Sequence, residues 1–257
     1  MKITIVGCGK MGSWIAKELA KENEVSVYDV NKSKIGSIGN VKNLNDLEEI
    51  KQFEPEVLIN AVTLQNTIKA FDEIVKYLPE NCILADVTSI KSGLPDYYKK
   101  CSFKFVSVHP MFGPTFATME SLREENAIII KEGDEQGKSL FQKLFSSLNI
   151  RIFDYSFKEH DEMMAYSLTT PFVSSMVFAA CMDSTAVPGS TFARHRKIAR
   201  GVLSEDDHLL AEILFNPNSL KQLEKITARL EFLKHVIKAK DYEETNGFFD
   251  KLRKNIG

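Results

Sequence analysis

Three glycines near the start of the chain have the spacing of a dinucleotide-binding turn. They lie in Gly7-Cys8-Gly9-Lys10-Met11-Gly12, directly after the apolar residues 2–6, which are typical of a buried strand. The first glycine permits a tight bend, the second lets the backbone approach a pyrophosphate, and the third lets the next helix pack close. The start of that helix offers unpaired N–H groups and partial positive charge to phosphates.

An acidic residue follows at the distance expected for ribose binding. Asp29 ends a second predicted strand, residues 25–29, about 20 residues after Gly9. A carboxylate there accepts hydrogen bonds from ribose hydroxyls and repels a 2′-phosphate, which favours NAD over NADP. Lys32 and Lys34 could bind such a phosphate, and the alternative for the whole motif is a glycine turn with Asp29 capping a loop. The candidate cofactor-binding residues are Gly7, Gly9, Lys10, Met11, Gly12, Asp29 and Thr63.

A histidine is the main candidate for acid–base chemistry. His109 begins His109-Pro110-Met111-Phe112-Gly113-Pro114, a loop that we expect after a fifth strand, residues 103–108. Ligands of a doubly wound sheet bind outside the carboxyl ends of its strands. An imidazole there can accept a hydroxyl proton while a hydride leaves the same carbon. The alternative is a strand-end histidine whose ring is satisfied by the backbone.

A serine is expected at the same edge of the sheet. Ser89 lies in Asp86-Val87-Thr88-Ser89-Ile90-Lys91, at the end of a fourth predicted strand. Because the carboxyl ends of neighbouring parallel strands share one rim, Ser89 and His109 could face the same crevice. The hydroxyl would orient the histidine or hold a substrate oxygen, or it caps the helix that follows.

The elements that carry these residues alternate between strand and helix and then become helical. We predict an α/β fold in which residues 1–156 form a doubly wound, mostly parallel NAD-binding sheet domain and residues 157–257 form an all-helical domain. A long helix over 158–181 should break or kink near Pro171. The other predicted strands are residues 57–62, 82–87, 126–130 and 151–153, and the later helices are residues 194–203, 206–215, 220–237 and 242–254.

Composition excludes several classes of partner. The 257 residues carry a net charge of −2, so no overall field favours nucleic acid or an anionic membrane. The chain has no eighteen-residue apolar run, and its four cysteines show neither C-x-x-C pairing nor metal-ligand spacing. We therefore expect a cytoplasmic protein without a metal.

Apolar residues recur at helical spacing through the second domain. A helical domain of about 100 residues with so much apolar surface often buries part of it against a second copy of itself. We therefore expect a homodimer formed through the helical domain.

Taken together, the motifs resemble those of the prephenate/arogenate dehydrogenase family, which makes tyrosine precursors. The resemblance rests on the His-Pro-Met-Phe-Gly-Pro block at 109–114, the Asp-x-x-Ser-x-Lys block at 86–91 and the amino-terminal glycine turn. It continues into Glu159-His160-Asp161, which is similar to the family's Glu-His-Asp at the start of its long helix. The resemblance covers nearly the whole chain.

The resemblance implies NAD-dependent oxidative decarboxylation of a ring that carries a hydroxyl opposite a carboxylate. His109 would take the proton of that hydroxyl, and Ser89 would help to orient the pair. A dianionic substrate also needs cationic anchors, which a planar guanidinium provides well. The family places a substrate arginine in the helix that corresponds to residues 191–200, with Arg194 as the first candidate here and Arg196 as the second. The alternative for this helix is a solvated basic face or a patch that binds a small anion or nucleic acid.

The chain departs from the family in one segment. Many relatives carry one or two histidines after the Glu-His-Asp block, whereas this chain reads Tyr166-Ser167-Leu168-Thr169-Thr170-Pro171-Phe172. Thr169 and Thr170 could replace the lost polar contacts to the substrate. The choice between prephenate and arogenate therefore stays open, with prephenate favoured.

Two other functions compete with this interpretation. One is a dehydrogenase of the same plan that acts on β-hydroxyacids, but the long helix lacks the Lys-x-x-x-Asn pair typical of that class. The other is a module that binds NAD and regulates a partner without turnover. The presence of His109, Ser89 and the arginine cluster makes this second alternative less attractive.

Overall fold

The chain forms two compact units. The computed structural model describes residues 1–36, 38–91, 93–113, 124–183, 185 and 187–257. The first unit is Met1–Glu162 and the second is Met163–Gly257. The division falls inside helix α7 (Phe157–Met164), whereas the sequence placed it before this helix. His160 and Asp161 therefore belong to the unit that contains the sheet.

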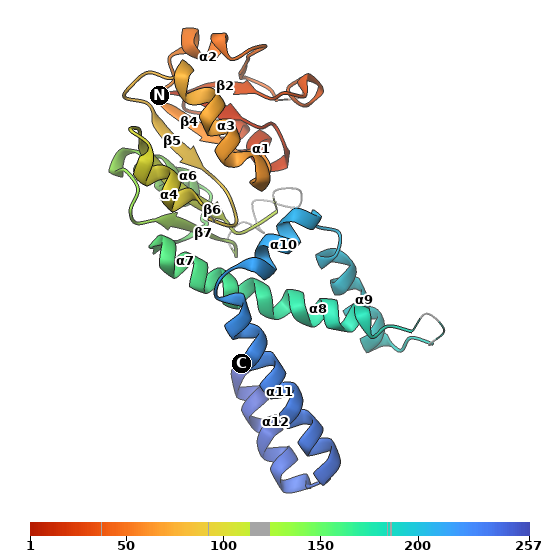
Figure 1. Cartoon of the computed structure of the whole chain (residues 1–257). Coiled ribbons are helices and arrows are strands. Elements are labelled where there is room, and N and C mark those ends of the chain that lie inside the picture. The colour runs from red at the N-terminus through yellow and green to blue at the C-terminus, as the bar shows by residue number, and fades with distance from the viewer. Residues whose placement is uncertain (37, 92, 114–123, 184, 186) are drawn as a thin grey trace. The chain divides into compact units, whose positions relative to one another are not determined.

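In the part of the first unit that the structure describes, one sheet of eight strands forms the centre (Figure 1). The strand order is β3-β2-β1-β4-β5-β6-β7-β8, and all neighbours are parallel except β6 and β7. The chain order reverses between β1 and β4, which is where doubly wound sheets bind nucleotides. The predicted fold class is thus confirmed. The strands are β1 (Lys2–Val6), β2 (Glu24–Tyr28), β3 (Lys42–Asn43), β4 (Val57–Asn60), β5 (Ile83–Asp86), β6 (Lys104–Pro110), β7 (Asn126–Ile130) and β8 (Arg151–Tyr155).

Helices pack against both faces of the sheet because side chains alternate along each strand. On one face Ile5 of β1 shares a core with Ile15 of α1 and Phe141 of α6. On the other face Tyr98 of α4 stacks on Phe105 of β6, with ring centroids 4.1 Å apart. The helices of this unit are α1 (Lys10–Leu19), α2 (Glu48–Phe53), α3 (Thr67–Ile74), α4 (Leu94–Lys100), α6 (Glu135–Ser147) and the first part of α7, with short 3₁₀ turns at Lys32–Lys34, Leu64–Asn66 and Val75–Tyr77.

Two strands differ from the sequence-based expectation. Strand β6 runs on through Pro110, because β7 pairs with it antiparallel and matches His109 to Ile128. His109 is therefore held within a strand rather than in the loop that we expected. Strand β3 was not predicted, since its two exposed residues carry no apolar pattern. Pro114, the last residue of the block that begins at His109, lies outside the described residues.

The second unit consists of helices alone among the residues described. Helix α7 passes through a π-helical turn, Ala165–Thr169, into α8 (Thr170–Ala180). Pro171 lies in the first turn of α8, directly after the π turn, and the helix runs on from Phe157 to Ala180 without the predicted break. The remaining helices are α9 (Ser190–Val202), α10 (Asp207–Phe215), α11 (Ser219–Ala239) and α12 (Tyr242–Ile256).

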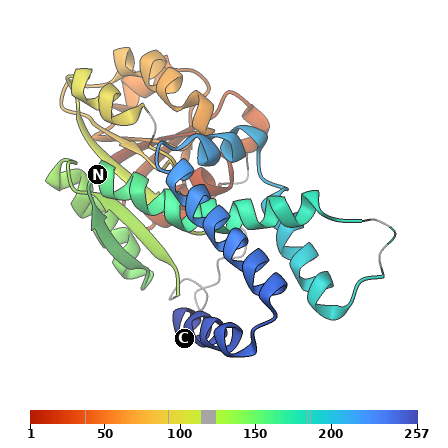
Figure 2. The same cartoon turned by 60° about the horizontal axis from the view of Figure 1, so that its bottom comes forward.

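Helices α11 and α12 overlap in Figure 1 but diverge from their connection in Figure 2. Phe232 and Phe248 join them, with ring centroids 5.0 Å apart. The second helix begins at an N-cap, Asp241, whose carboxylate accepts hydrogen bonds from two backbone amides of its first turn.

One helical stretch passes a simple test for a membrane span. Among the described residues, Phe157–Ala180 is long and apolar enough to cross a membrane by length and composition, with a mean hydropathy of 1.2. A helix in the core of a soluble protein passes the same test. The absence of a membrane partner therefore stays a prediction.

Candidate functional site

The glycine turn joins β1 to α1 with no space for larger residues at two of its positions. Gly7 adopts a φ of +92°, and a Cβ there would lie 2.7 Å from the backbone of Ala61. A Cβ on Gly12 would lie 1.9 Å from the carbonyl oxygen of Gly7. By contrast, no atom lies within 4 Å of the place where a Cβ on Gly9 would project. Gly7 and Gly12 thus allow close packing, while Gly9 leaves open space beside the backbone.

The first turn of α1 offers amides for an anion. Gly9 is the N-cap, and the first backbone hydrogen bond of the helix runs from Ser13 N to Gly9 O at 2.9 Å. The amides of Lys10, Met11 and Gly12 come before it and have no partner within the helix. This arrangement suits a pyrophosphate at the helix start.

Asp29 connects the end of β2 to the glycine turn. Its Oδ2 accepts a 2.7 Å hydrogen bond from the amide of Cys8, and its Oδ1 accepts one of 2.7 Å from the amide of Asn31. The second contact is the loop cap that we considered as the alternative role. Each carboxylate oxygen has two lone pairs, so each can still accept a ribose hydroxyl.

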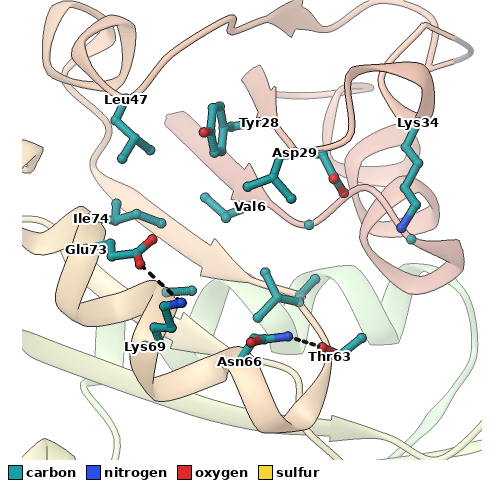
Figure 3. Close-up of a pocket in the computed structure, with 16 residues that line it drawn as sticks. Val6, Tyr28, Asp29, Lys34, Leu47, Thr63, Asn66, Lys69, Glu73 and Ile74 are labelled. Atoms are coloured by element: carbon teal, nitrogen blue, oxygen red, sulfur yellow. Dashed lines mark hydrogen bonds and ion pairs between the residues drawn. The ribbon is translucent and has the colours of Figure 1, made fainter. Parts of the chain in front are cut away.

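Several of these residues line one pocket (Figure 3). Its volume of ≈420 Å³ falls in the range of small-molecule sites. The lining includes Gly7, Gly9, Asp29 and Thr63, whereas Lys10, Met11 and Gly12 are not part of it. Apolar and charged side chains complete the pocket, among them Leu47, Ala70, Ile74, Lys34, and the pair Lys69 and Glu73.

The pocket fits the adenosine half of a dinucleotide. The open space at Gly9 admits a phosphate, Asp29 offers acceptors for ribose hydroxyls, and Leu47 and Ile74 supply apolar surface for a base. Lys32 is held away from such a role, because its Nζ lies 4.2 Å from the ring centroid of Tyr28 and donates to the carbonyl of Leu44 at 3.3 Å.

A chain of two imidazoles and a carboxylate lies at the end of β6. His109 Nδ1 is 3.1 Å from His160 Nε2, and His160 Nδ1 is 3.3 Å from Asp161 Oδ1. His109 and His160 are both buried. His109 and His160, 51 positions apart in the sequence, are brought together because α7 begins directly after β8. Helix α7 packs against the sheet through Phe157, whose ring is 6.1 Å from that of Phe105.

This geometry selects one tautomer of each ring. The carboxylate of Asp161 accepts the proton on His160 Nδ1, which leaves His160 Nε2 as an acceptor. His109 then donates from Nδ1, and its Nε2 is left without a proton. A neutral imidazole with an unprotonated Nε2 is the form that a general base requires.

Burial keeps both rings neutral. It lowers the pKa of His109 well below 6.5, and the electrostatic interactions with His160 and with the charge of Lys91 lower it further. Burial also lowers the pKa of His160, although the hydrogen bond to Asp161 acts in the opposite direction. Since a protonated His109 could not accept a proton, the low pKa favours its use as a base near neutral pH.

The other candidates in the first unit have different surroundings. Ser89 is partly exposed, and the hydrogen bonds of the described residues do not link it to His109. Ser89 does not cap the next helix either, because the N-cap of α4 is Gly93. Its role toward the substrate stays a prediction.

In the second unit the predicted substrate residues lie on two helices. Arg194 and Arg196 are exposed on α9. Thr169 is buried at the π turn, where its hydroxyl is 2.7 Å from that of Ser219 in α11. The carbonyl of Thr170 accepts a hydrogen bond of 2.8 Å from Ser174. All four stay predictions as substrate contacts.

A family model matches more than half of this chain. It describes the nucleotide-binding domain of prephenate dehydrogenase and matches residues 15–150. The chain belongs to the prephenate dehydrogenase family. The matched region contains Asp29, Ser89 and His109 but neither the glycine turn nor His160, so the description of those two features rests on the geometry above.

Curated relatives carry related names. The chain is 24% identical over 251 residues to arogenate dehydrogenase 1, chloroplastic, of Arabidopsis thaliana. This match covers 91% of this chain and 39% of the relative. It is 22% identical over 278 residues to a probable arogenate/prephenate dehydrogenase of Methanocaldococcus jannaschii, covering 100% of this chain and 61% of the relative. The chain thus spans less than two thirds of either relative.

A solved structure shares the fold. The chain is similar to prephenate dehydrogenase from A. aeolicus in complex with hydroxyphenyl propionate and NAD⁺, with a TM-score of 0.84 and 18% sequence identity. The likeness covers 99% of this chain and 96% of the other. At this identity the comparison shows the fold of a prephenate dehydrogenase family member.

His160 and Lys91 are functional candidates that sequence reasoning missed. We noted both only as members of family motifs, Glu-His-Asp and Asp-x-x-Ser-x-Lys, and gave them no part in the chemistry. The contact between His109 and His160 could not be predicted because the two residues are far apart in the chain, and no local pattern shows that α7 packs near the end of β6. A polar motif at a helix start could have pointed to His160.

His160 should matter through His109. Replacing His160 with phenylalanine keeps a ring in the buried site but removes the acceptor for His109 Nδ1. We expect kcat to fall by roughly tenfold or more, because His109 then populates the unproductive tautomer. Steady-state kinetics with an exposed-histidine control, His208→Phe, would check this, and an unchanged kcat would remove His160 from the array.

Proposed function

We propose that this chain catalyses the NAD-dependent oxidative decarboxylation of prephenate to 4-hydroxyphenylpyruvate and CO₂, a step of tyrosine biosynthesis. The observation that carries the proposal is the array of His109, His160 and Asp161 at the end of β6. It leaves an unprotonated imidazole nitrogen in the same unit as a pocket suited to a dinucleotide. The family supports the reaction class.

The residues of this chain would perform the proton transfers. The ring hydroxyl of the substrate gives its proton to Nε2 of His109, and the O–H electron pair forms a carbonyl as hydride leaves that carbon. NAD, when bound, supplies the acceptor for this hydride. The bond to the carboxylate on the opposite ring carbon then breaks, CO₂ leaves, and its electron pair makes the ring aromatic. The new phenolic oxygen takes the proton back from His109.

The assay follows NADH absorbance with purified protein, NAD and either prephenate or arogenate. We expect a rise in absorbance with prephenate and a higher kcat/KM for prephenate than for arogenate. A higher value for arogenate would assign the alternative substrate, which the name of the Arabidopsis thaliana relative carries. Tight NAD binding without turnover on either compound would instead support an NAD-sensing module.

Arg194 is our first candidate for a substrate anchor. We expect Arg194→Ala to raise KM for prephenate with little change in kcat, because a carboxylate anchor binds the ground state and the transition state alike. Arg196→Ala and Arg200→Ala, on the same exposed helix, are matched controls. A larger KM change in either control would move the anchor to that residue.

We further propose a homodimer formed through the helical unit. Large apolar side chains remain exposed along α11 and α12 in the single chain, among them Leu220, Leu230, Leu233, Ile237, Phe249, Leu252 and Ile256. Covering them would remove apolar surface from water. Light scattering coupled to size exclusion should give twice the chain mass of 29.1 kDa. A cytoplasmic location stays a prediction.

A further inference from the structure

A lysine is completely buried beneath the end of β6. Lys91 and Asp86 both have 0% exposure, and Lys91 Nζ is 2.7 Å from Asp86 Oδ1. Removing an ammonium from water is costly unless hydrogen bonds and an opposite charge compensate it. Hydrophobic residues of similar size often serve stability equally well at such positions. Stability alone therefore does not explain why a charged residue is buried here.

Three acceptors surround the ammonium group. Besides Asp86, Lys91 Nζ donates to the carbonyl oxygen of Val108 at 2.8 Å and contacts the hydroxyl of Thr88 at 3.4 Å. An ammonium has three donors, so this set satisfies it. Tyr98 completes the site by donating its hydroxyl to Asp86 Oδ2 at 2.8 Å.

The contact to Val108 supports β6 on the side where β5 no longer pairs with it, while β7 pairs with Val108, His109 and Pro110 on the other side. The ladder between β5 and β6 ends where Asp86 pairs with Ser107, one residue before Val108. His109 is the next residue along β6. Lys91 therefore provides a hydrogen bond where β5 no longer does, directly before the imidazole.

We propose that Lys91 is a positioning residue for the reaction, whose ammonium holds the end of β6 and thereby the imidazole of His109. The inference rests on the proposed function in taking His109 as the base. Lys91 acts through the backbone and through its charge and does not touch the substrate in this account. Its partners come from three elements: Asp86 from β5, Val108 from β6 and Thr88 from the segment between β5 and α4.

The charge of Lys91 also acts on the two imidazoles. After burial and the electrostatic interaction with His160, it is the third cause that lowers the pKa of His109, and it lowers the pKa of His160 as well. The negative charges that face Lys91 are Asp86 from β5 and Asp161 from α7, and both raise its pKa against the effect of burial. Removing the ammonium should therefore raise the pKa of His109.

The test compares Lys91→Met with wild type and with Lys99→Met, which removes an exposed lysine from α4. His109 must be neutral to accept a proton, so the acid limb of the pH profile of kcat/KM reports its pKa. In Lys91→Met we expect this limb at higher pH, by about half a pH unit or more, and a kcat lower by roughly tenfold. Lys99→Met should match wild type, and Lys91→Arg should restore part of both values.

A purely structural role would give a different result. Loss of folded protein lowers the rate at every pH and leaves the limb in place, so an unmoved limb in folded Lys91→Met would overturn the proposal. If Lys91→Met does not fold because Asp86 is left unpaired, the pH profile of kcat/KM is measured instead on the double variant Lys91→Met/Asp86→Asn.

A second readout needs no turnover. Titration of the His109 imidazole by NMR in wild type and Lys91→Met should show the same upward shift. If wild type is inactive but the pKa of His109 is higher in Lys91→Met, the proposed function is rejected and the role of Lys91 is kept. If wild type is active and the pKa of His109 does not change in Lys91→Met, only the role of Lys91 is rejected.

Discussion

Replacing His109 with asparagine should lower kcat by about 10²–10⁴-fold, the usual contribution of general acid–base catalysis, while KM for the substrate changes little. Asparagine can hydrogen-bond to a hydroxyl, but its amide cannot take a proton at neutral pH. The buried site also accepts the smaller side chain without a new charge. Steady-state kinetics at pH 7 would measure both parameters.

The pH dependence supplies a second measure of the same change. In wild type the neutral ring is the active form and its pKa lies well below 6.5. The value of kcat/KM should therefore hold through pH 6.5 and fall only in more acidic solution, and this limb should disappear in His109→Asn. His208→Asn, on the exposed start of α10, is the matched control and should behave as wild type. A near-normal kcat in His109→Asn would show that another group is the base.

Local patterns in the sequence were sufficient to predict most of the fold. Apolar runs bounded by polar residues gave seven of the eight strands, because buried parallel strands are nearly continuous in apolar residues. The exception, β3, is a two-residue edge strand without such a signal. Helical spacing gave α8 to α12, whereas the helix that we predicted to break or kink near Pro171 runs on from Phe157 to Ala180, with a π turn just before the proline.

The candidate site was predictable only where its parts are close in sequence. The glycine turn and Asp29 are related by a fixed spacing within one βαβ unit, so the pocket they line followed from the sequence. The contact between His109 and His160 joins residues in β6 and α7, and it depends on how α7 packs after β8. The antiparallel register of β6 and β7, which places His109 inside a strand, also has no local signature.

The second large effect concerns the glycine turn. A Cβ on Gly12 would overlap the carbonyl oxygen of Gly7 at 1.9 Å, so Gly12→Ala forces α1 away from the turn. Overpacking of this kind typically costs about 1–3 kcal/mol of unfolding free energy, and the amides at the helix start are displaced with it. We therefore expect a lower melting temperature together with the loss of measurable NAD binding.

Gly9→Ala separates binding from folding at the same turn. No atom lies within 4 Å of the added methyl, so the free energy of unfolding should match wild type. The methyl would occupy the space that we assign to the pyrophosphate, and NAD affinity should fall by roughly tenfold or more. Gly36→Ala, which also meets no atom within 4 Å, controls for the loss of a glycine. Thermal unfolding and calorimetric titration with NAD measure the two quantities, and unchanged affinity in Gly9→Ala would place the pyrophosphate elsewhere.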